Sequence, residues 1–572
     1  IVRENKGSKK QFFVSRLKTL EECEAIAREL RQKNPAQADV LDFLLKAKKG
    51  VFLSEISEKC SVSSIKTLEK KGILKIEQIE VDRSPLIDPA YFITKPKKLN
   101  DDQKEALDKI SSSFGTYKAH LLYGITGSGK TEVYLQAIAK VLERGEGALM
   151  LIPEISLTEQ TIERFRSRFE VPIAILNYRL SDGERRDEWQ KIKKGEARIV
   201  IGARSSLFAP MPKLGLIIVD EEHEATFKQS DEAPRYHVRE AALMRAKTLG
   251  IPVVLGSATP SLESYFNTEK GKFELSVLKG RATDHGKPHV SIVDMKEEYK
   301  RAGQFTLFSE PLLDGIKKRY QKGEQTLIFL NRRGYHSYQL CPSCGEAIKC
   351  DSCDTTLTFH KQESVICCHL CGVSKPPLRE CPSCKGSAPL KFKGFGTELV
   401  ESSLKAIFPD IRTLRMDADT TRHKGSHQKL FRDFGKGKAD VLIGTQMIAK
   451  GLHFPEVSLV GVINCDMSLH LPDFRASEMT FQLLTQVAGR AGRGTMKGEV
   501  IFQTLMPDNR TLHLAKEQDY LTFYKEELEV RKMLNFPPFS FMAKISARSD
   551  SEKGAFNALE KIRHDLLKEL PP

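Results

Sequence analysis

The chain has 572 residues, of which 40% are apolar and 29% charged, and its formal net charge is +15. At roughly 150 residues per domain, this length predicts three to four domains with room for large cores. No apolar run in this sequence approaches the roughly 18 residues of a membrane span, and the sequence shows no signal-peptide pattern. The positive charge favours a polyanionic partner, nucleic acid first, although a merely basic surface gives the same number.

The N-terminal region predicts a small helical module. Residues 1–18 are polar and basic and predict a linker. Three helices and then an alternating strand are predicted over residues 34–47, 53–60, 61–71 and 73–81. This order is the outline of a winged helix, whose third helix commonly contacts DNA, although a structural three-helix module has the same outline. We interpret residues 19–95 as a winged helix.

From about Leu99 onward, apolar strands alternate with helices, as in an α/β fold with buried parallel strands. The strands read AHLLYG, GALMLIP, ARIVIG, LGLIIVD and PVVLGS, and after a pause QTLIFL, ADVLIG, SLVGVIN and GEVIFQT. We predict two α/β lobes, the first over residues 96–280 and the second over residues 281–340 and 388–530. A cysteine-rich insertion over residues 341–387 interrupts the second lobe.

A phosphate-binding loop is predicted where the strand HLLYG meets the helix TEVYLQAIAKVL. The connecting residues read GITGSGKT, a P-loop in the strand–loop–helix context that it requires. The glycines let the backbone wrap the phosphates of ATP, Lys130 would reach the β- and γ-phosphates, and Thr131 would bind Mg²⁺. The predicted nucleotide-binding residues of the loop are Gly124, Thr126, Gly127, Ser128, Gly129, Lys130 and Thr131.

A pair of acids follows another apolar strand, in the sequence LGLIIVDEEH. Asp220 would hold Mg²⁺, and Glu221 would polarise the attacking water. The alternative is a solvated acidic turn. The position of the pair directly after a buried strand favours the catalytic reading.

A second lobe supplies two arginines in the sequence QVAGRAGR. Arg490 and Arg493 are three residues apart, so on a helix they share one face. Phosphoryl transfer needs positive charge near the γ-phosphate, and arginines from the second lobe would provide it when the lobes close on ATP. A basic surface helix is the alternative.

The motifs GITGSGKT, DEEH, GSATPS, GTQMIAKG and QVAGRAGR together resemble those of superfamily 2 helicases. LIPEISLT, GARSSLFAP, FLNRRGY, GFGTE, LPDFRASE, PPF and the paired cysteines are similar to the PriA family of bacterial replication-restart helicases. The resemblance spans about residues 99 to 540. It implies two RecA-like P-loop lobes and an ATP-dependent 3′→5′ DNA helicase that recognises abandoned replication forks and initiates primosome assembly.

The resemblance also assigns roles to residues outside the phosphate loop. Gln103 would contact adenine, and Ser257 and Thr259 would couple hydrolysis to DNA movement. The segment ATFKQSDEAPRYH resembles the aromatic-rich DNA-sensing loop of the family, in which aromatic rings stack on bases and cations meet phosphate. A loop packed by its own aromatic rings is the alternative. The DNA-contacting residues would be Phe227, Lys228, Arg235 and Tyr236.

The same resemblance implies the protein's surroundings. The expected partners are forked and single-stranded DNA, single-stranded DNA-binding protein and the primosome or helicase-loading proteins, with no membrane. We expect a monomer in the bacterial cytoplasm, associated with the nucleoid. Because the chain begins at Ile1 and ends at Pro572, we expect the family's N-terminal 3′-end-binding domain to lie outside it, and residues 531–572 to begin a truncated C-terminal domain.

Nine of the twelve cysteines lie between Cys341 and Cys384, and eight of them form four C-x₂-C pairs. Such pairs bend two thiolates onto one tetrahedral ion, which predicts two closed, structural Zn²⁺ sites; an iron–sulfur cluster is the rival. The family resemblance implies an interleaved pairing, in which the outermost two pairs share one ion and the inner two share the other. The predicted ligands are Cys341, Cys344, Cys350, Cys353, Cys368, Cys371, Cys381 and Cys384.

Two other functions are compatible with parts of the sequence. The protein could be chiefly an ATP-gated scaffold that binds DNA structures and recruits loader proteins, with unwinding secondary. It could also be a competence-type DNA-uptake ATPase, which likewise combines a helicase core with zinc knuckles. LPDFRASE and PPF count against the uptake ATPase, and a Lys130→Ala variant separates the helicase from the scaffold.

Overall fold

The structure is a computed structural model of the chain. The residues it describes are 10–18, 20–45, 51–57, 60–80, 94–154, 157–177, 180–229, 233–280, 288–330, 338–341, 343–344, 346–351, 356–360, 364–368, 373–386, 389–393, 396–417, 420, 426–449, 454, 456–471, 473–492, 498–547 and 549–569.

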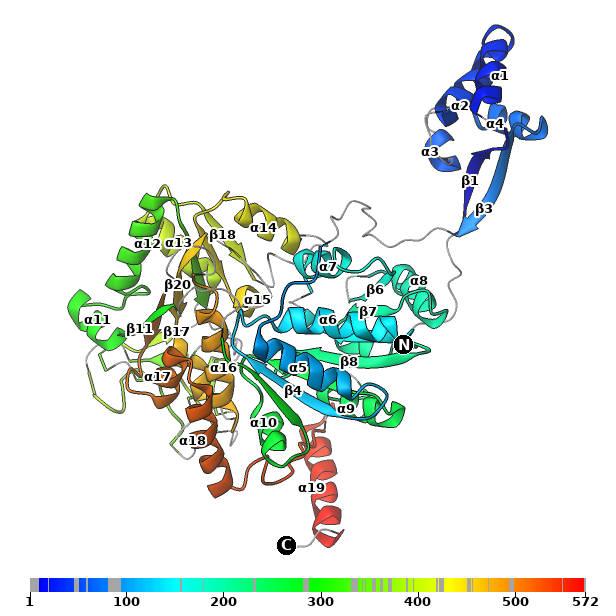
Figure 1. The fold of residues 1–572 in the computed structure, drawn as a ribbon. Coiled ribbons are helices and arrows are strands. Elements are labelled where there is room, and N and C mark those ends of the chain that lie inside the picture. Colours follow the sequence, from blue (N-terminus) through cyan, green and yellow to red (C-terminus); the bar gives the residue numbers. More distant parts are fainter. Residues whose placement is uncertain are drawn as a thin grey trace.

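The N-terminal module is a three-stranded antiparallel sheet with four helices, in the order β1, α1, α2, β2, α3, α4, β3. Its helices gather at one end of the ribbon formed by β1 and β3 (Figure 1). The bounds are β1 Lys10–Arg16, α1 Leu20–Lys33, α2 Pro35–Leu45, β2 Val51–Phe52, α3 Leu53–Ser57, α4 Val62–Lys70 and β3 Leu74–Glu80. Helices, strands and a small sheet fit the expected winged helix.

Two parts of this module were not expected. The predicted linker over residues 1–18 is wrong in its second half, because Lys10–Arg16 forms β1 and pairs with β3 along its whole length. Val14 lies at the centre of that strand and is fully buried in the core of the module, so the strand is held by both its ladder and its packing. Helix α1 was missed as well. The basic and polar residues around both elements masked the apolar positions.

The first lobe is a parallel sheet of seven strands in the order β10-β4-β9-β8-β5-β7-β6. Alternate side chains of its strands enter two separate cores, so both faces are covered. Helices α5, α6 and α7 cover one face, and α8 and α9 cover the other. The bounds are α5 Asp101–Ser112, β4 Ala119–Gly124, α6 Lys130–Glu143, β5 Gly147–Leu151, α7 Glu159–Arg166, β6 Ile173–Leu176, α8 Asp182–Lys193, β7 Ile199–Gly202, β8 Leu214–Asp220, α9 Val238–Leu249, β9 Val253–Ser257, α10 Leu262–Glu269 and β10 Glu274–Leu278.

The second lobe is a parallel sheet of six strands in the order β11-β21-β20-β12-β19-β18. Helices α12 and α13 pack on one face, and α16, α17 and α18 on the other, where Leu262 of the first lobe joins the same core. The bounds are β11 His289–Asp294, α11 Met295–Ala302, α12 Glu310–Lys322, β12 Gln325–Leu330, α13 Thr397–Ile407, β18 Thr413–Met416, α14 Ser426–Gly435, β19 Val441–Gly444, α15 Gln446–Ala449, β20 Val457–Ile463, α16 Ala476–Ala488, β21 Glu499–Thr504, α17 Arg510–Glu517 and α18 Tyr520–Met533.

The α/β architecture of two lobes with a cysteine-rich insertion in the second is therefore confirmed. The insertion lies between β12 and α13 and contains a two-stranded and a three-stranded sheet. Its strands are β13 Tyr338–Leu340, β14 Thr358–His360, β15 Val365–Cys367, β16 Ser374–Lys375 and β17 Lys391–Lys393. The expected domain limit after residue 530 is wrong, because it cuts α18, which continues to Met533 before Asn535 adopts a left-handed conformation.

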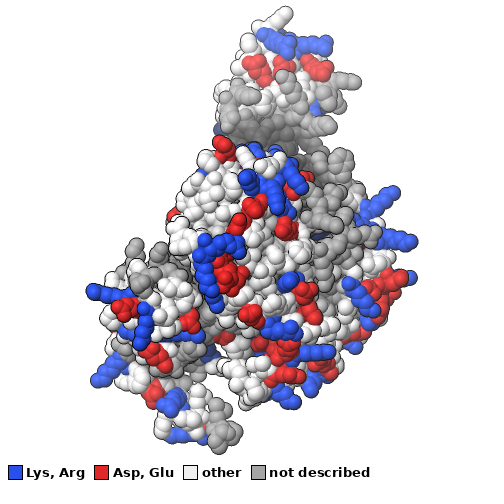
Figure 2. Space-filling model, turned by 90° about the vertical axis from the view of Figure 1, so that its left-hand side faces the viewer, with Lys and Arg blue, Asp and Glu red and all other residues white. Residues whose placement is uncertain are grey.

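Beyond α18 the chain runs without regular structure to a last exposed helix, α19 (Glu552–Glu569). Within the ranges given above, no helix is long and apolar enough to cross a membrane. Figure 2 shows one face of the molecule, on which Lys and Arg side chains alternate with Asp and Glu rather than forming one basic patch.

Candidate nucleotide site between the lobes

The carboxyl ends of β4, β8 and β9 carry three of the predicted motifs. These strands are neighbours in a parallel sheet, so GITGSGKT, DEEH and GSATPS emerge at the same edge. Helix α16 of the second lobe, which leads into QVAGRAGR, lies against this edge (Figure 1). The four motifs, which are far apart in the sequence, thus meet at one place.

The phosphate loop has the backbone that a bound phosphate needs. Gly127 and Gly129 both have φ of 86°, a left-handed conformation that glycine adopts without strain, and α6 begins immediately afterwards at Lys130. The first amides of α6 therefore point out of the loop as an anion site. The Lys130 ammonium donates a hydrogen bond to the Gly124 carbonyl at 2.5 Å. These residues fit the phosphates of ATP.

Gln103 supports the phosphate loop directly. Its Nε2 donates to the Ser128 carbonyl at 2.9 Å, and its Oε1 accepts from the Asn100 amide at 3.0 Å in the capping box that starts α5. The side chain is almost fully buried. The geometry gives Gln103 the role of holding the loop in shape, and its contact with adenine stays a prediction.

Asp220 and Glu221 lie where β8 ends. The Tyr134 hydroxyl donates to Asp220 Oδ1 at 3.0 Å. Burial, and then repulsion from Glu221, raise the pKa of Asp220 to about 6, against the opposing effects of Lys130 and Tyr134. A divalent cation relieves both causes at once, so the half-buried acid pair fits Mg²⁺.

His223 joins the two lobes at this edge. Its Nδ1 lies 2.7 Å from the Ser257 hydroxyl in GSATPS, and its Nε2 lies 2.8 Å from the side-chain amide of Gln486 in QVAGRAGR. The Thr259 amide donates to the same Ser257 oxygen at 2.9 Å. His223 and Gln486 were not among the predicted site residues. Both stand inside quoted motifs, but only the fold shows that they touch.

Arg490 reaches the same place from the second lobe. Burial lowers the pKa of its guanidinium to about 10, and the nearby Glu221 opposes this shift. Next to it, a Cβ added at Gly489 would stand only 3.2 Å from the Thr126 side chain of the phosphate loop, so the Gly489 backbone packs closely against that side chain. Arg493 lies outside the described residues.

A buried ion pair between Glu222 and Arg239 lies next to Asp220 and Glu221 in the chain. Glu222 is fully buried, and its Oε2 accepts from Arg239 Nη1 at 3.1 Å. The amide of Ser261, just after GSATP, donates to Glu222 Oε1 at 2.7 Å. The pair therefore fixes DEEH against the start of α10. Arg239 belongs to neither DEEH nor GSATPS, so these motifs alone do not reveal the ion pair.

An antiparallel bridge joins Lys228 and His237, near the two ends of the expected DNA-sensing loop. Lys228 and Arg235 are exposed and Tyr236 is partly exposed, so these three can meet DNA. Phe227 cannot, and its predicted stacking on bases is wrong: the side chain is 1% exposed because it packs in a core of the first lobe. Beside the loop lies a cavity of about 340 Å³, lined by Pro153, Glu154, Arg204, Ala225, Thr226, Phe227 and Lys228.

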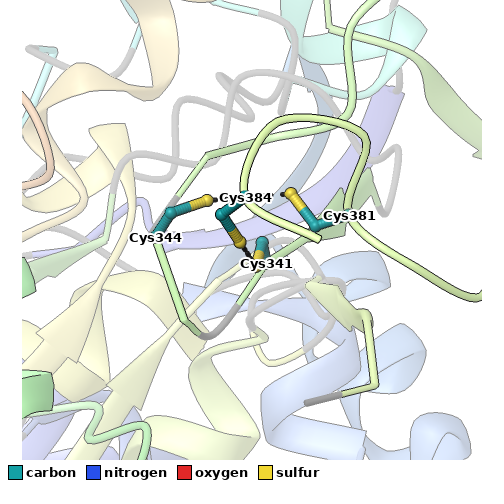
Figure 3. Close-up of side chains that lie close together, drawn as sticks. All are labelled: Cys341, Cys344, Cys381 and Cys384. Atoms are coloured by element: carbon teal, nitrogen blue, oxygen red, sulfur yellow. Dashed lines mark hydrogen bonds between the residues drawn. The ribbon is translucent and has the colours of Figure 1, made fainter. Parts of the chain in front are cut away.

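Four cysteines of the insertion meet at one point (Figure 3). The sulfurs of Cys341, Cys344, Cys381 and Cys384 all lie within 4.8 Å of one another, and the closest pairs are 3.5 and 3.7 Å apart. Zn–S bonds of about 2.3 Å in a tetrahedron place sulfurs about 3.8 Å apart, so the set fits Zn²⁺. Burial raises the pKa of Cys341, but hydrogen bonds from the Cys344 and Ser343 amides outweigh it and bring the pKa to about 7.

This grouping agrees with the interleaved pairing that the resemblance implied. Of the inner set, Cys350 and Cys368 are buried in one small core, whereas Cys353 and Cys371 lie outside the described residues. The second metal site therefore stays a prediction.

Three family models match the chain: the DEAD/DEAH box helicase over residues 100–267, the helicase conserved C-terminal domain over residues 394–495, and the PriA DNA helicase Cys-rich region over residues 350–376. Replication restart protein PriA of Bacillus subtilis (strain 168) is 46% identical over 552 residues, which are 96% of this chain and 68% of that protein. The PriA protein of Chlamydia pneumoniae is 46% identical over 95% of this chain and 73% of its own length. The chain belongs to the PriA family of replication restart proteins. The PriA protein of Haemophilus influenzae is 42% identical over 86% of this chain and 68% of its own length.

Membership confirms the family that the motifs indicated. It places the two lobes as the two helicase domains of an ATP-dependent DNA helicase, and the four-cysteine cluster beside the Cys-rich region of the family.

Proposed function

We propose that the protein is an ATP-driven 3′→5′ DNA translocase that unwinds abandoned replication forks and starts primosome assembly. The observation that carries the mechanism is the contact of His223 with Ser257 and Gln486, because it links the acid pair, GSATPS and the arginine motif across the lobes. A change at the γ-phosphate therefore has a physical route into the movement of one lobe against the other.

The residues at this edge have separate tasks in the proposed reaction. Lys130 binds the β- and γ-phosphates, and Asp220 with Thr131 holds Mg²⁺, which when bound offsets phosphate charge. Glu221 holds the attacking water and accepts its proton. Arg490, joined by Arg493, stabilises the charge that develops on the γ-phosphate.

The remaining assignments complete the proposal. Ser257 and Thr259 transmit hydrolysis to DNA movement, and Lys228, Arg235 and Tyr236 contact unpaired DNA. Two structural Zn²⁺ ions are held by the eight paired cysteines. The partners are forked DNA, single-stranded DNA-binding protein and primosome or loader proteins, and the protein acts as a monomer on the bacterial nucleoid.

The decisive experiment compares the chain with its Lys130→Ala variant on forks that carry a 3′ or a 5′ single-stranded tail. We expect the variant to lose ATP hydrolysis and unwinding at least about a hundredfold, because the phosphates lose their cation. Fork binding, measured by fluorescence anisotropy, should survive. Unwinding that starts only from a 5′ tail would reverse the proposed polarity, and unwinding by the variant would refute the ATP site.

A further inference from the structure

Arg531, near the end of α18, heads the largest fully buried side chains among the described residues, with 1% of its surface exposed. A buried guanidinium is costly unless its charge and donors are matched. Here the partners come from three different helices. They are Glu478 of α16 at 2.6 Å, Glu263 of α10 at 3.4 Å, Glu527 of α18 at 3.4 Å and the Pro537 carbonyl at 3.3 Å.

Two of these acids belong to different lobes. Glu263 stands in the first turn of α10, directly after GSATPS, whereas Glu478 stands in the first turn of α16, the helix that leads to Arg490. Glu478 also uses its other oxygen to accept the amide of Leu262 at 3.0 Å. One carboxylate from the second lobe therefore holds the start of a first-lobe helix, and Arg531 holds that carboxylate.

Aromatic side chains extend the same contact along α18. Tyr265 of α10 packs against Tyr520 and Tyr524, with ring centroids 5.5 and 4.6 Å apart. The Tyr524 hydroxyl donates to Glu269 at the end of α10, at 2.9 Å. Tyr123, which directly precedes the phosphate loop, lies 5.3 Å from the Tyr520 ring. Helix α18 thus contacts α10 along most of its length, from Glu263 to Glu269.

We propose that α18 is a working part of the motor and that Arg531 is a positioning residue, which orients Glu478 and through it holds GSATPS in register with the arginine helix. The helix follows the last recognised helicase motif, yet it connects the segments on both sides of the ATP site. This inference rests on the proposed function as an ATP-driven helicase. Loss of Arg531 uncouples hydrolysis from unwinding, because ATP still binds to Lys130 while the lobes no longer move as a pair.

The test measures base pairs unwound per ATP hydrolysed, together with kcat and KM for ATP, in the full chain and in Arg531→Met. We expect the unwinding yield per ATP to fall about tenfold while KM for ATP changes less than about twofold. Arg510→Met is the matched control. Arg510 of α17 pairs with Glu526 of α18 at 2.6 Å, but this pair is exposed and joins two helices of the second lobe. The control should keep the wild-type yield.

Two further variants separate coupling from folding. Glu478→Gln with Arg531→Met removes both buried charges, and its thermal midpoint should return toward the wild-type value while the yield stays low. Tyr524→Phe removes a single hydroxyl from α18 and should lower the yield about threefold with an unchanged thermal midpoint.

The possible outcomes are distinct. A folded double variant with the wild-type yield overturns the proposed role of Arg531 by showing that it only stabilises the fold. A Tyr524→Phe variant with the wild-type yield overturns the proposal that α18 is a working part of the motor. If the unaltered chain neither hydrolyses ATP on DNA nor unwinds it, the proposed function fails before the role of Arg531 is reached.

Discussion

Among the described residues, two of the contacts between the lobes are built on different principles. At the nucleotide edge, His223 and Gln486 form a hydrogen bond between the lobes. Close by, Gly489 of the second lobe packs against Thr126 of the first, so this contact contains few side-chain atoms. At α18, buried charges and tyrosine rings in tilted and edge-on contact join the lobes. A thin polar contact can break and re-form in each cycle, whereas a dense buried one acts as a pivot. The comparison predicts that substitutions at the nucleotide edge stop ATP hydrolysis. Substitutions at the α18 contact, here called the pivot, should instead allow hydrolysis but lower the number of base pairs unwound per ATP.

The largest expected effect lies at the nucleotide edge. Glu221→Gln should lower the rate of ATP hydrolysis about a thousandfold, because the amide cannot take the proton of the attacking water. Binding of a fluorescent ATP analogue should be unchanged, since the phosphate loop keeps Lys130. If the variant hydrolyses ATP within about tenfold of the wild-type rate, Glu221 is not the group that accepts the proton of the attacking water.

The sequence identified the edge and missed the pivot, for a physical reason. A phosphate loop needs particular glycines in a row, so GITGSGKT is visible in eight residues, and parallel strands bring DEEH and GSATPS beside it. Glu263 lies 268 residues before Arg531 and Glu478 lies 53 residues before it, and each alone is an ordinary charged residue of a helix. Phe227 shows the converse limit: an aromatic residue in a DNA-loop motif gave no sign that its ring turns into the core.

The next prediction concerns a buried ion pair that lies within the first lobe, between Glu222 and Arg239, and measures how much that pair contributes to the free energy of unfolding. Arg239→Met leaves Glu222 as a buried carboxylate without its cation, which should destabilise the first lobe by about 3 kcal/mol. Urea unfolding followed by the fluorescence of Trp189, the single tryptophan, which packs on that lobe's core, measures the loss. Adding Glu222→Gln should recover part of it. A loss below about 1 kcal/mol would mean that the donors of Ser261 and Ser264 suffice for Glu222.

A pH titration distinguishes the core of the first lobe from both contacts. Burial lowers the pKa of His120, in β4, from 6.5 to about 4, so the unfolded chain binds a proton over this range that the folded chain does not. The contribution of His120 to stability is therefore fully present well above pH 6.5 and is lost as the pH falls from 6.5 toward 4. By about pH 5 the loss from His120 should be about 2 kcal/mol.

His120→Gln tests this origin in the same urea titration, because glutamine can still meet the Ser113 hydroxyl, 2.9 Å from the imidazole, but does not titrate. The variant should show a smaller difference between neutral and acid pH than the wild type. An identical difference in both proteins would assign the acid sensitivity to another group.

The smallest expected effect sharpens the comparison at the thin contact itself. Gly489→Ala places a methyl group 3.2 Å from Thr126, and the phosphate loop must shift by a few tenths of an ångström to admit it. We expect kcat for ATP hydrolysis to fall about tenfold, since small displacements of reacting groups are costly. Gly435→Ala is the control, because a methyl group there meets no atom within 4 Å. The yield of unwinding per ATP should be unchanged in both variants, because α18 still holds the lobes together, whereas a loss of yield in Gly489→Ala would mean that the edge and the pivot are one mechanical unit.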